Sequence, residues 1–373
     1  MKILYCLAGT WNSGGMERIV IAKANWLAKH GHNVIIVTTE QFDKPDFFQL
    51  EKGVNRIDLN IGYMPIMDFG LLKKIKAKYS LRKLHKKKLA KVVHDENPDV
   101  IISTFSNEVT IVPKIANNAK TLAEFHFSRN HRLIQPPGIV KNYINKYLTW
   151  AYESYASKYD KFVTLTDEDS CDWKNLTNKI TIPNFITRTT EKKATLQRKR
   201  MIAVGRLSYQ KGFDRLIEAW RLVNQKHPDW ILDIYGGGEL KASLTKQIDN
   251  AGLCSVIHIQ NPTNSITQEY LSSSALLMTS RYEGLPMVLM EAMSVGLPSV
   301  CFKFKCGPAD IIHNGVNGLL VPNNEINLFA KAVCNIIENE ELRTQLGQNA
   351  YESMNQYQME PIMHKWEETL KSL

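Results

Sequence analysis

Short apolar runs alternate along the chain with segments in which apolar residues recur at helical spacing. Residues 2–7 predict a strand, 9–15 form a glycine loop, and 16–30 predict a helix that ends at Gly31, where a left-handed residue is least strained. The continuous apolar run at 34–37 is typical of a strand buried on both faces of a parallel sheet. Further strands are expected at 99–103, 121–124 and 161–165. The first half is therefore predicted to be α/β.

The same alternation restarts after residue 185. The polar segment 187–200 predicts a linker, and a second α/β pattern follows it. Strands are expected at 201–204, 230–235, 276–278 and 298–300, with helices at about 213–223 and from about 240. We predict two Rossmann-like domains, 1–185 and 186–354, that face each other across a cleft lined by the loops at their strand ends. Residues 355–373 carry a last helix that either caps the second domain or packs back toward the first.

The positive charge of the chain is concentrated in its first half. The net charge is +10, and residues 1–185 contribute +9 of it, with 27 lysines and arginines against 18 aspartates and glutamates. Much of this excess lies from Lys73 to Lys91, in a helix-like segment that also carries apolar residues such as Leu72 and Ile75. Such a helix either lies on an anionic membrane surface or is simply solvated. No RNA-binding, helix-turn-helix or zinc-finger signature is present, so we predict no nucleic-acid partner.

Cysteine usage and hydropathy indicate the compartment. The cysteines are scattered, without metal-ligand spacing, and no segment reaches about 18 uninterrupted apolar residues. The start of the chain lacks the pattern of a signal peptide. We expect a cytoplasmic protein, peripheral on the inner face of the cytoplasmic membrane if the basic helix binds lipid. The cysteines are Cys6, Cys171, Cys254, Cys301, Cys306 and Cys334.

Four motifs of the second half stand in a characteristic order. They are residues 204–213 (VGRLSYQKGF), 235–240 (YGGGEL), 283–298 with EGLP and EAMSVGLP, and 315–321 (GVNGLLV). Together they resemble the signature of the retaining family 4, or group 1, glycosyltransferases. The first half resembles the family more weakly, through 13–18 (SGGMER) and His126. The resemblance implies the GT-B fold, with donor and acceptor in a cleft between two Rossmann-like domains.

Arg206 and Lys211 are the candidate cations of the site. Both follow the first strand of the second domain on one turn. A diphosphate leaving group gains negative charge as the glycosidic bond breaks, so fixed cations aimed at it accelerate the reaction. By resemblance these two side chains hold the diphosphate and take part in catalysis.

Glu283 and Glu291 are the candidate carboxylates. The first lies in a loop and the second in a helix that Pro286 is expected to start. By resemblance Glu291 accepts hydrogen bonds from the ribose and Glu283 touches the donor sugar. Gly284 and Leu285 lie at the start of that helix, where free N–H groups suit a phosphate.

Glycine turns are expected to let the backbone approach the nucleotide. The loops do not spell G-x-G-x-x-G and lack the acidic residue of a dinucleotide site, so a dehydrogenase is disfavoured. The donor-binding glycines are Gly14, Gly15, Gly205 and Gly237.

His126, after the expected strand 121–124, is the catalytic candidate of the first domain. By resemblance it lies close to the donor sugar and the reacting centre. Its neighbours are candidates for acceptor contacts: Glu124, Ser128, Arg129, His131 and Arg132.

The triplet Asp167-Glu168-Asp169 matches the D-x-D metal motif of the other large glycosyltransferase fold. It follows a strand and precedes a helix expected over 171–176, so acidic residues at a helix N-terminus explain it better. We predict no metal and no other cofactor.

The resulting hypothesis is a retaining hexosyltransferase. It moves a sugar from a nucleotide diphosphate, expected to be a UDP-hexose or UDP-N-acetylhexosamine, to a lipid-linked or surface-polysaccharide acceptor. Two alternatives stay open. One is a sugar-nucleotide epimerase or a phosphorylase with a similar cleft, and the other is a non-catalytic membrane or nucleic-acid binding protein.

Overall fold

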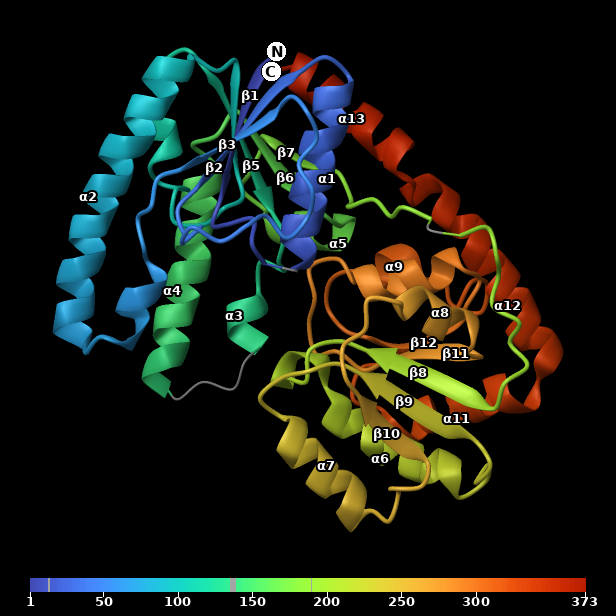
Figure 1. The fold of residues 1–373 in the computed structure, drawn as a ribbon. Coiled ribbons are helices and arrows are strands. Elements are labelled where there is room, and N and C mark those ends of the chain that lie inside the picture. Colours follow the sequence, from blue (N-terminus) through green and yellow to red (C-terminus); the bar gives the residue numbers. More distant parts are fainter. Residues whose placement is uncertain (13, 135–138, 189) are drawn as a thin grey trace.

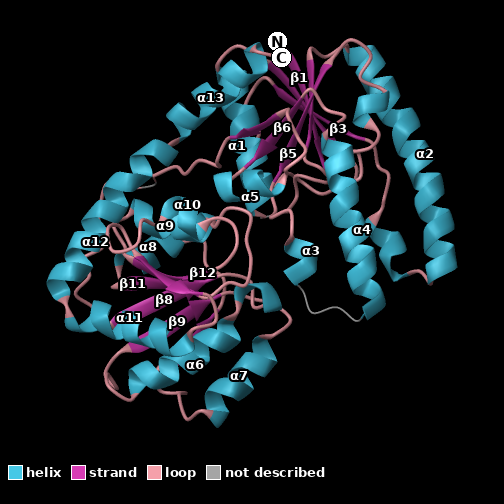
Figure 2. Cartoon of the chain, turned by 180° about the vertical axis from the view of Figure 1, so that it is seen from behind, coloured by secondary structure: helices cyan, strands magenta, loops and turns pink. Residues whose placement is uncertain are grey.

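The chain folds into two α/β lobes, one above the other in Figure 1. The computed structural model describes residues 1–12, 14–134, 139–188 and 190–373. Each lobe is built on a twisted parallel sheet with helices on its faces (Figure 2). The prediction of two Rossmann-like domains facing across a cleft is confirmed.

The sheet of the first lobe places its first strand in the middle. In spatial order its strands are β3 (Val54–Asp58), β2 (Asn33–Thr38), β1 (Lys2–Leu7), β4 (Val100–Ser103), β5 (Lys120–Phe125), β6 (Lys161–Thr164) and β7 (Lys179–Thr181). All neighbours pair in parallel. Its helices are α1 (Gly15–Lys29), α2 (Leu71–Glu96), α3 (His131–Ile134), α4 (Ile139–Ala156) and α5 (Asp167–Asp172), with short 3₁₀ turns at η1 (Met64–Asp68) and η2 (Val112–Lys114). The strand order reverses beside β1, which is where ligands bind in such sheets.

The second lobe repeats this arrangement. Its parallel strands are, in spatial order, β10 (Ile257–Gln260), β9 (Ile231–Tyr235), β8 (Arg200–Val204), β11 (Ala275–Met278), β12 (Ser299–Lys303) and β13 (Leu319–Pro322). Its helical elements are η3 (Tyr209–Lys211), α6 (Phe213–Asn224), α7 (Lys241–Asn250), α8 (Ile266–Leu271), α9 (Met287–Ser294), α10 (Pro308–Ile311), α11 (Ile326–Glu338), α12 (Glu340–Ser353) and η4 (Met354–Tyr357). The strand β8 holds the central place that β1 holds in the first lobe, so the glycine turns after these two strands are equivalent.

The chain crosses between the lobes in both directions at one place. Ile186 forms a parallel bridge with Gln358, and its N–H donates to the carbonyl of Tyr357 at 2.8 Å. The segment expected to be a linker is partly packed on the second lobe, since the N–H of Ala194 donates to the carbonyl of Val295 and Leu196 is buried. The two crossing segments therefore support each other.

The last helix, α13 (Met359–Lys371), returns to the first lobe. Its apolar residues Ile362, Trp366 and Leu370 are buried in the core that also holds β1 and α1. Figures 1 and 2 both show the two chain ends next to each other at the top of this lobe. The sequence left open whether this helix caps the second domain or packs back toward the first. In the structure it packs against the first lobe.

Removing the Trp366 ring should destabilise the first lobe. The Trp366 ring is buried and covers the Lys23 ammonium group, whose Nζ lies 4.1 Å from the ring centroid. Trp366→Ala therefore leaves a cavity at this position. Large-to-small core changes of this kind cost about 3–5 kcal/mol. Urea unfolding followed by far-ultraviolet circular dichroism measures the loss. The control is Trp150→Ala, at a ring that is 62% exposed, which should change little. Equal stability of both variants would contradict this packing.

Candidate active site between the lobes

A cavity of about 570 Å³ opens where the two sets of strand ends face each other. Five of the predicted donor-binding residues line it: Gly14, Gly205, Arg206, Gly237 and Glu291. The other lining residues are Asn12, Glu17, Val204, Tyr235, Gly236, Pro262, Thr263, Ile266 and Tyr270. Residues from both lobes therefore build one site at the position expected for a Rossmann-type ligand.

Glycines allow the loops of the second lobe to touch. A Cβ added at Gly236 would lie 1.9 Å from the carbonyl oxygen of Gly205, so no other residue fits there without moving the backbone. Gly237 has room for a side chain, with only Pro262 near, and its backbone faces the cavity. Gly15 begins α1 and is not among the residues that line the cavity, and Ser13 of the same motif lies outside the described residues.

Lys211 and Glu283 form an ion pair at the edge of this site. The Lys211 stem passes over Gly205, and its Nζ lies 2.6 Å from Glu283 Oε1. Gln210 Nε2 at 3.0 Å and Ser280 Oγ at 2.8 Å also donate to this carboxylate. The Glu283 carboxylate is thus fixed by three donors on its own lobe.

Arg206 differs from Lys211 in having no fixed partner. Its side chain is exposed to the cavity, and among the residues of the described ranges its guanidinium has no hydrogen-bond or ion-pair partner. A guanidinium of this kind is available to bind a phosphate in bidentate geometry.

Glu291 is contacted from the opposite lobe. Lying on α9, which begins one residue after Pro286, it forms an ion pair with Arg18 of α1. Both side chains are partly exposed, at 23% and 44% respectively. Solvent therefore reaches this pair, and a ligand can compete with Arg18 for the carboxylate.

His126 meets the loop that carries Glu283. A Cβ added at Gly284 would lie 2.2 Å from the carbonyl oxygen of His126, so only glycine permits this contact between the lobes. The next residue, Leu285, is buried. Glu17 also lies in this region, and its pKa is raised because burial outweighs the effects of its backbone hydrogen bond and of His126. The structure thus brings His126 to the loop of the predicted catalytic glutamate.

Beneath His126 lies a buried ion pair that the sequence did not reveal. Lys23 of α1 pairs with Glu124 of β5, and both side chains are almost fully buried. Burial alone would raise the pKa of Glu124, but the charges of Lys23 and His126 outweigh it and lower this pKa to about 2. Oε2 of Glu124 lies 3.4 Å from His126 Nε2. The Glu124 carboxylate therefore stays ionised and lies next to the His126 ring.

The predicted acceptor contacts around His126 need correction. Glu124 and Ser128 have no exposed surface, so the prediction that they touch an acceptor is wrong. Arg129 donates to Glu153 at 3.1 Å, and Arg132 donates to the Tyr152 hydroxyl. The remaining neighbour, His131, contacts the carbonyl of Ser128 through its Nδ1. These side chains hold the loop together.

The acidic triplet 167–169 opens the helix α5, which begins four residues earlier than the sequence predicted. Asp169 accepts from the Arg129 N–H and from the Trp173 indole, and Glu168 accepts from the Cys306 N–H of the other lobe at 2.8 Å. Two of its three carboxylates therefore have structural partners.

Comparisons with known proteins agree with this geometry. The second half, residues 186–353, matches the model of "Glycosyl transferases group 1", and residues 13–189 match that of "Glycosyltransferase Family 4". A glycosyltransferase of Haemophilus influenzae without an assigned reaction is 30% identical over 98% of both chains. The amylovoran biosynthesis glycosyltransferase AmsD of Erwinia amylovora is 28% identical over 99% of both.

The fold has a close match among solved structures. The Anabaena protein HepE, crystallised with UDP and glucose, superposes over 100% of both chains with a TM-score of 0.77 at 19% identity. Three findings agree. The chain has two facing Rossmann-like lobes, residues of the family's motifs line the cleft between them, and the relatives match the chain from end to end. The chain belongs to the family 4, or group 1, glycosyltransferases and is a transferase with the GT-B fold.

Proposed function

We propose that this enzyme transfers a sugar from a UDP-hexose or UDP-N-acetylhexosamine to a hydroxyl of a glycan acceptor, with retention at the anomeric carbon. The observation that carries this proposal is the cavity between the lobes, in which the guanidinium of Arg206 and the carboxylate of Glu291 lie beside glycine turns. This guanidinium has no partner among the described residues. The crystal structure of HepE with UDP and glucose supports the choice of nucleotide.

The diphosphate is placed between Arg206 and Lys211. Arg206 needs no rearrangement to bind it, whereas Lys211 turns from Glu283 toward the phosphate or is shared between the two. When Lys211 turns away, one oxygen of the Glu283 carboxylate becomes free to accept a hydrogen bond from a hydroxyl of the donor sugar. Glu291 exchanges Arg18 for the ribose hydroxyls. Because each exchange replaces one charge-assisted contact by another, the cost of donor binding is small.

In the proposed reaction no side chain of the enzyme forms a covalent bond with the sugar. The departing phosphate removes the proton of the acceptor hydroxyl as that hydroxyl attacks from the same face, and the two cations stabilise the charge on the leaving group. We place His126 close to the donor sugar at this centre, with its Nε2 3.4 Å from the buried carboxylate of Glu124. Closure of the two lobes around the donor excludes water and limits hydrolysis of the donor, and contacts between the lobes such as Lys305 with Asp172 at 2.7 Å favour the closed arrangement.

The acceptor is proposed to be a lipid-linked or surface polysaccharide. The name of AmsD places that relative in the biosynthesis of amylovoran. A growing glycan on a lipid carrier would hold the enzyme at the cytoplasmic face of a membrane. In the described ranges, no helix has both the length and the apolar character needed to cross a bilayer.

Two helices of the first lobe offer a surface for this membrane contact. The second half of α2 packs into the core through Leu89 and Val93, but Leu72, Ile75 and Tyr79 of its first half are exposed among lysines. Figures 1 and 2 show α4 running beside α2. Among the described side chains of α4, the large hydrophobic residues Tyr143, Ile144, Tyr147 and Trp150 are exposed. Aromatic rings interspersed with lysines suit the interface of an anionic bilayer.

UDP should raise the melting temperature of the protein more than GDP or ADP does, because a ligand that binds only the folded state stabilises it. Arg206→Ala should weaken UDP binding by about 10- to 100-fold, the contribution of a charge-assisted hydrogen bond. Calorimetric titration measures the affinity of the unaltered protein and of the variant for UDP. The control is Arg221→Ala, on the exposed side of α6, which should bind UDP normally.

Two results would contradict the proposal. One is UDP binding that is equal in the Arg206 and Arg221 variants. The other is conversion of the donor without an acceptor, giving an epimer or depending on inorganic phosphate, which would indicate an epimerase or a phosphorylase.

Vesicles containing anionic lipid should carry the protein upward in a flotation gradient, and vesicles of phosphatidylcholine alone should not. Lys76→Gln with Lys83→Gln should weaken binding by about 30-fold, at about 1 kcal/mol per lysine. Tyr147→Ser with Trp150→Ser should weaken it further. Lys246→Gln with Val316→Ser on the second lobe is the matched control. Flotation that the first-lobe variants leave unchanged would exclude this surface.

The transfer reaction is expected to need no metal. Treatment with EDTA should leave the initial rate of sugar transfer unchanged. A rate that collapses in EDTA and returns on addition of manganese would contradict this expectation.

A further inference from the structure

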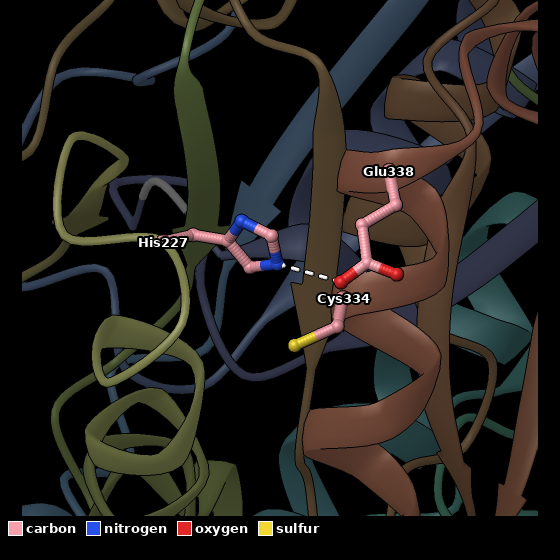
Figure 3. Close-up of side chains that lie close together, drawn as sticks. All are labelled: His227, Cys334 and Glu338. Carbon is pink, nitrogen blue, oxygen red and sulfur yellow. Dashed lines mark hydrogen bonds and ion pairs between the residues drawn. The ribbon is translucent and has the colours of Figure 1, made fainter.

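Three side chains with metal-binding atoms meet on the second lobe, away from the cleft. His227 lies in the turn between α6 and β9, and Cys334 and Glu338 stand one turn apart on α11. Figure 3 shows the His227 ring directed at the Glu338 carboxylate, with Cys334 beside them. The turn before β9 lies at the opposite edge of the sheet from the glycine loop after it, so this cluster is separate from the candidate active site.

The spacing of the three groups approaches that of a metal site. His227 Nε2 lies 2.9 Å from Glu338 Oε1, and the ligand atoms of all three residues lie within 4.8 Å of one another. Ligands of a tetrahedral zinc ion stand about 2.0–2.3 Å from the metal and hence roughly 3–4 Å from each other. The three ligand atoms must therefore move closer together for one zinc ion to bind all of them.

The chemistry of the three ligands favours zinc over harder cations. A thiolate, an imidazole and a carboxylate form a mixed sulfur, nitrogen and oxygen set, whereas calcium and magnesium select oxygen alone. Cys334 is buried and Glu338 exposed, so the site has a protected side and an open side. A cavity of about 530 Å³, lined in part by Cys334, Glu338 and Asn335, leaves room for water as the fourth ligand.

We propose that His227, Cys334 and Glu338 form a zinc-binding site. Its ligands come from both sides of the contact between α6 and α11, which pack against each other. A bound ion would cross-link the end of α6 to the end of α11 and thereby stabilise the second lobe. The site has no part in sugar transfer, so the proposal stands or falls independently of the catalytic assignment.

Metal binding to the full-length protein tests the proposal directly. After dialysis against a chelator, Zn²⁺ is titrated in competition with a chromophoric chelator. We expect one equivalent to bind, and we expect Cys334→Ala and His227→Ala each to weaken binding by at least about 100-fold. Co²⁺ should give the thiolate charge-transfer band in the near ultraviolet and the visible bands of a tetrahedral ion, and both should vanish in Cys334→Ala.

Cys254→Ala is the matched control. Cys254 is an exposed thiol 3.0 Å from the Asp249 carboxylate, and the variant should bind zinc as the unaltered protein does. Circular dichroism of each variant without metal shows whether it is folded. Zinc affinity that is equal in the Cys334, His227 and Cys254 variants, or a Co²⁺ spectrum without a thiolate band, would overturn the proposal and leave His227 and Glu338 as a surface ion pair.

Discussion

The backbone crosses between the two lobes in both directions at one shared edge, and this constraint decides which surfaces face each other. The chain leaves the first lobe at Ile186 and returns beside it at Gln358, and the two segments are bridged to each other. With both connections on the same edge, the loops at the carboxyl ends of the two sheets are directed toward a common cleft. Beside this crossing α5 contacts residues 305–310: Asp310 Oδ1 accepts from the Asp167 N–H at 3.0 Å, and the Asp310 carbonyl accepts from the Tyr357 hydroxyl at 3.0 Å. A glycine turn from each lobe reaches the cavity because of this arrangement.

The charge pairs of the molecule differ in how readily they can exchange partners. Lys23 and Glu124 have no access to water, and removing either would leave an uncompensated buried charge, at a cost of about 3–5 kcal/mol. Glu291 lines the cavity, and its pair with Arg18 is partly exposed, whereas the pair of Lys211 with Glu283 lies next to the lining residue Gly205 and is largely buried. A pair that is partly solvated can be opened by a charged ligand at little cost. The pair of Lys23 with Glu124 thus stabilises the fold, and the exposed pair of Arg18 with Glu291 can exchange a partner for a ligand.

A continuous set of contacts joins the last helix to the cleft. Trp366 of α13 covers the ammonium group of Lys23, Lys23 pairs with Glu124, and Glu124 lies next to His126. The end of the chain therefore helps to build the floor of the site, although it follows the whole of the second lobe in sequence. Signals in the sequence for this arrangement were slight. A lysine at position 23 on the apolar face of α1 was one of them, because a buried lysine requires a partner.

The sequence by itself determined the inner strands, the glycine turns and the order of the family motifs. Strands with neighbours on both sides are mostly apolar and buried, and all of them were predicted. The four strands at the sheet edges, β3, β7, β10 and β13, were not, since an edge strand such as β7 has no fully buried residue to mark it.

Only the tertiary structure decided which groups meet. The structure pairs Glu283 with Lys211 and Glu291 with Arg18. It buries Glu124 and Ser128, which the sequence had suggested as acceptor contacts. It also shows that one half of α2 is packed and the other half is exposed. It also brought His227 to Cys334 and Glu338, which no spacing along the chain suggests. The physical reason is that hydrophobic periodicity and turn propensity are local properties of a chain, whereas ion pairs, burial and ligand sets arise between residues that only packing brings together.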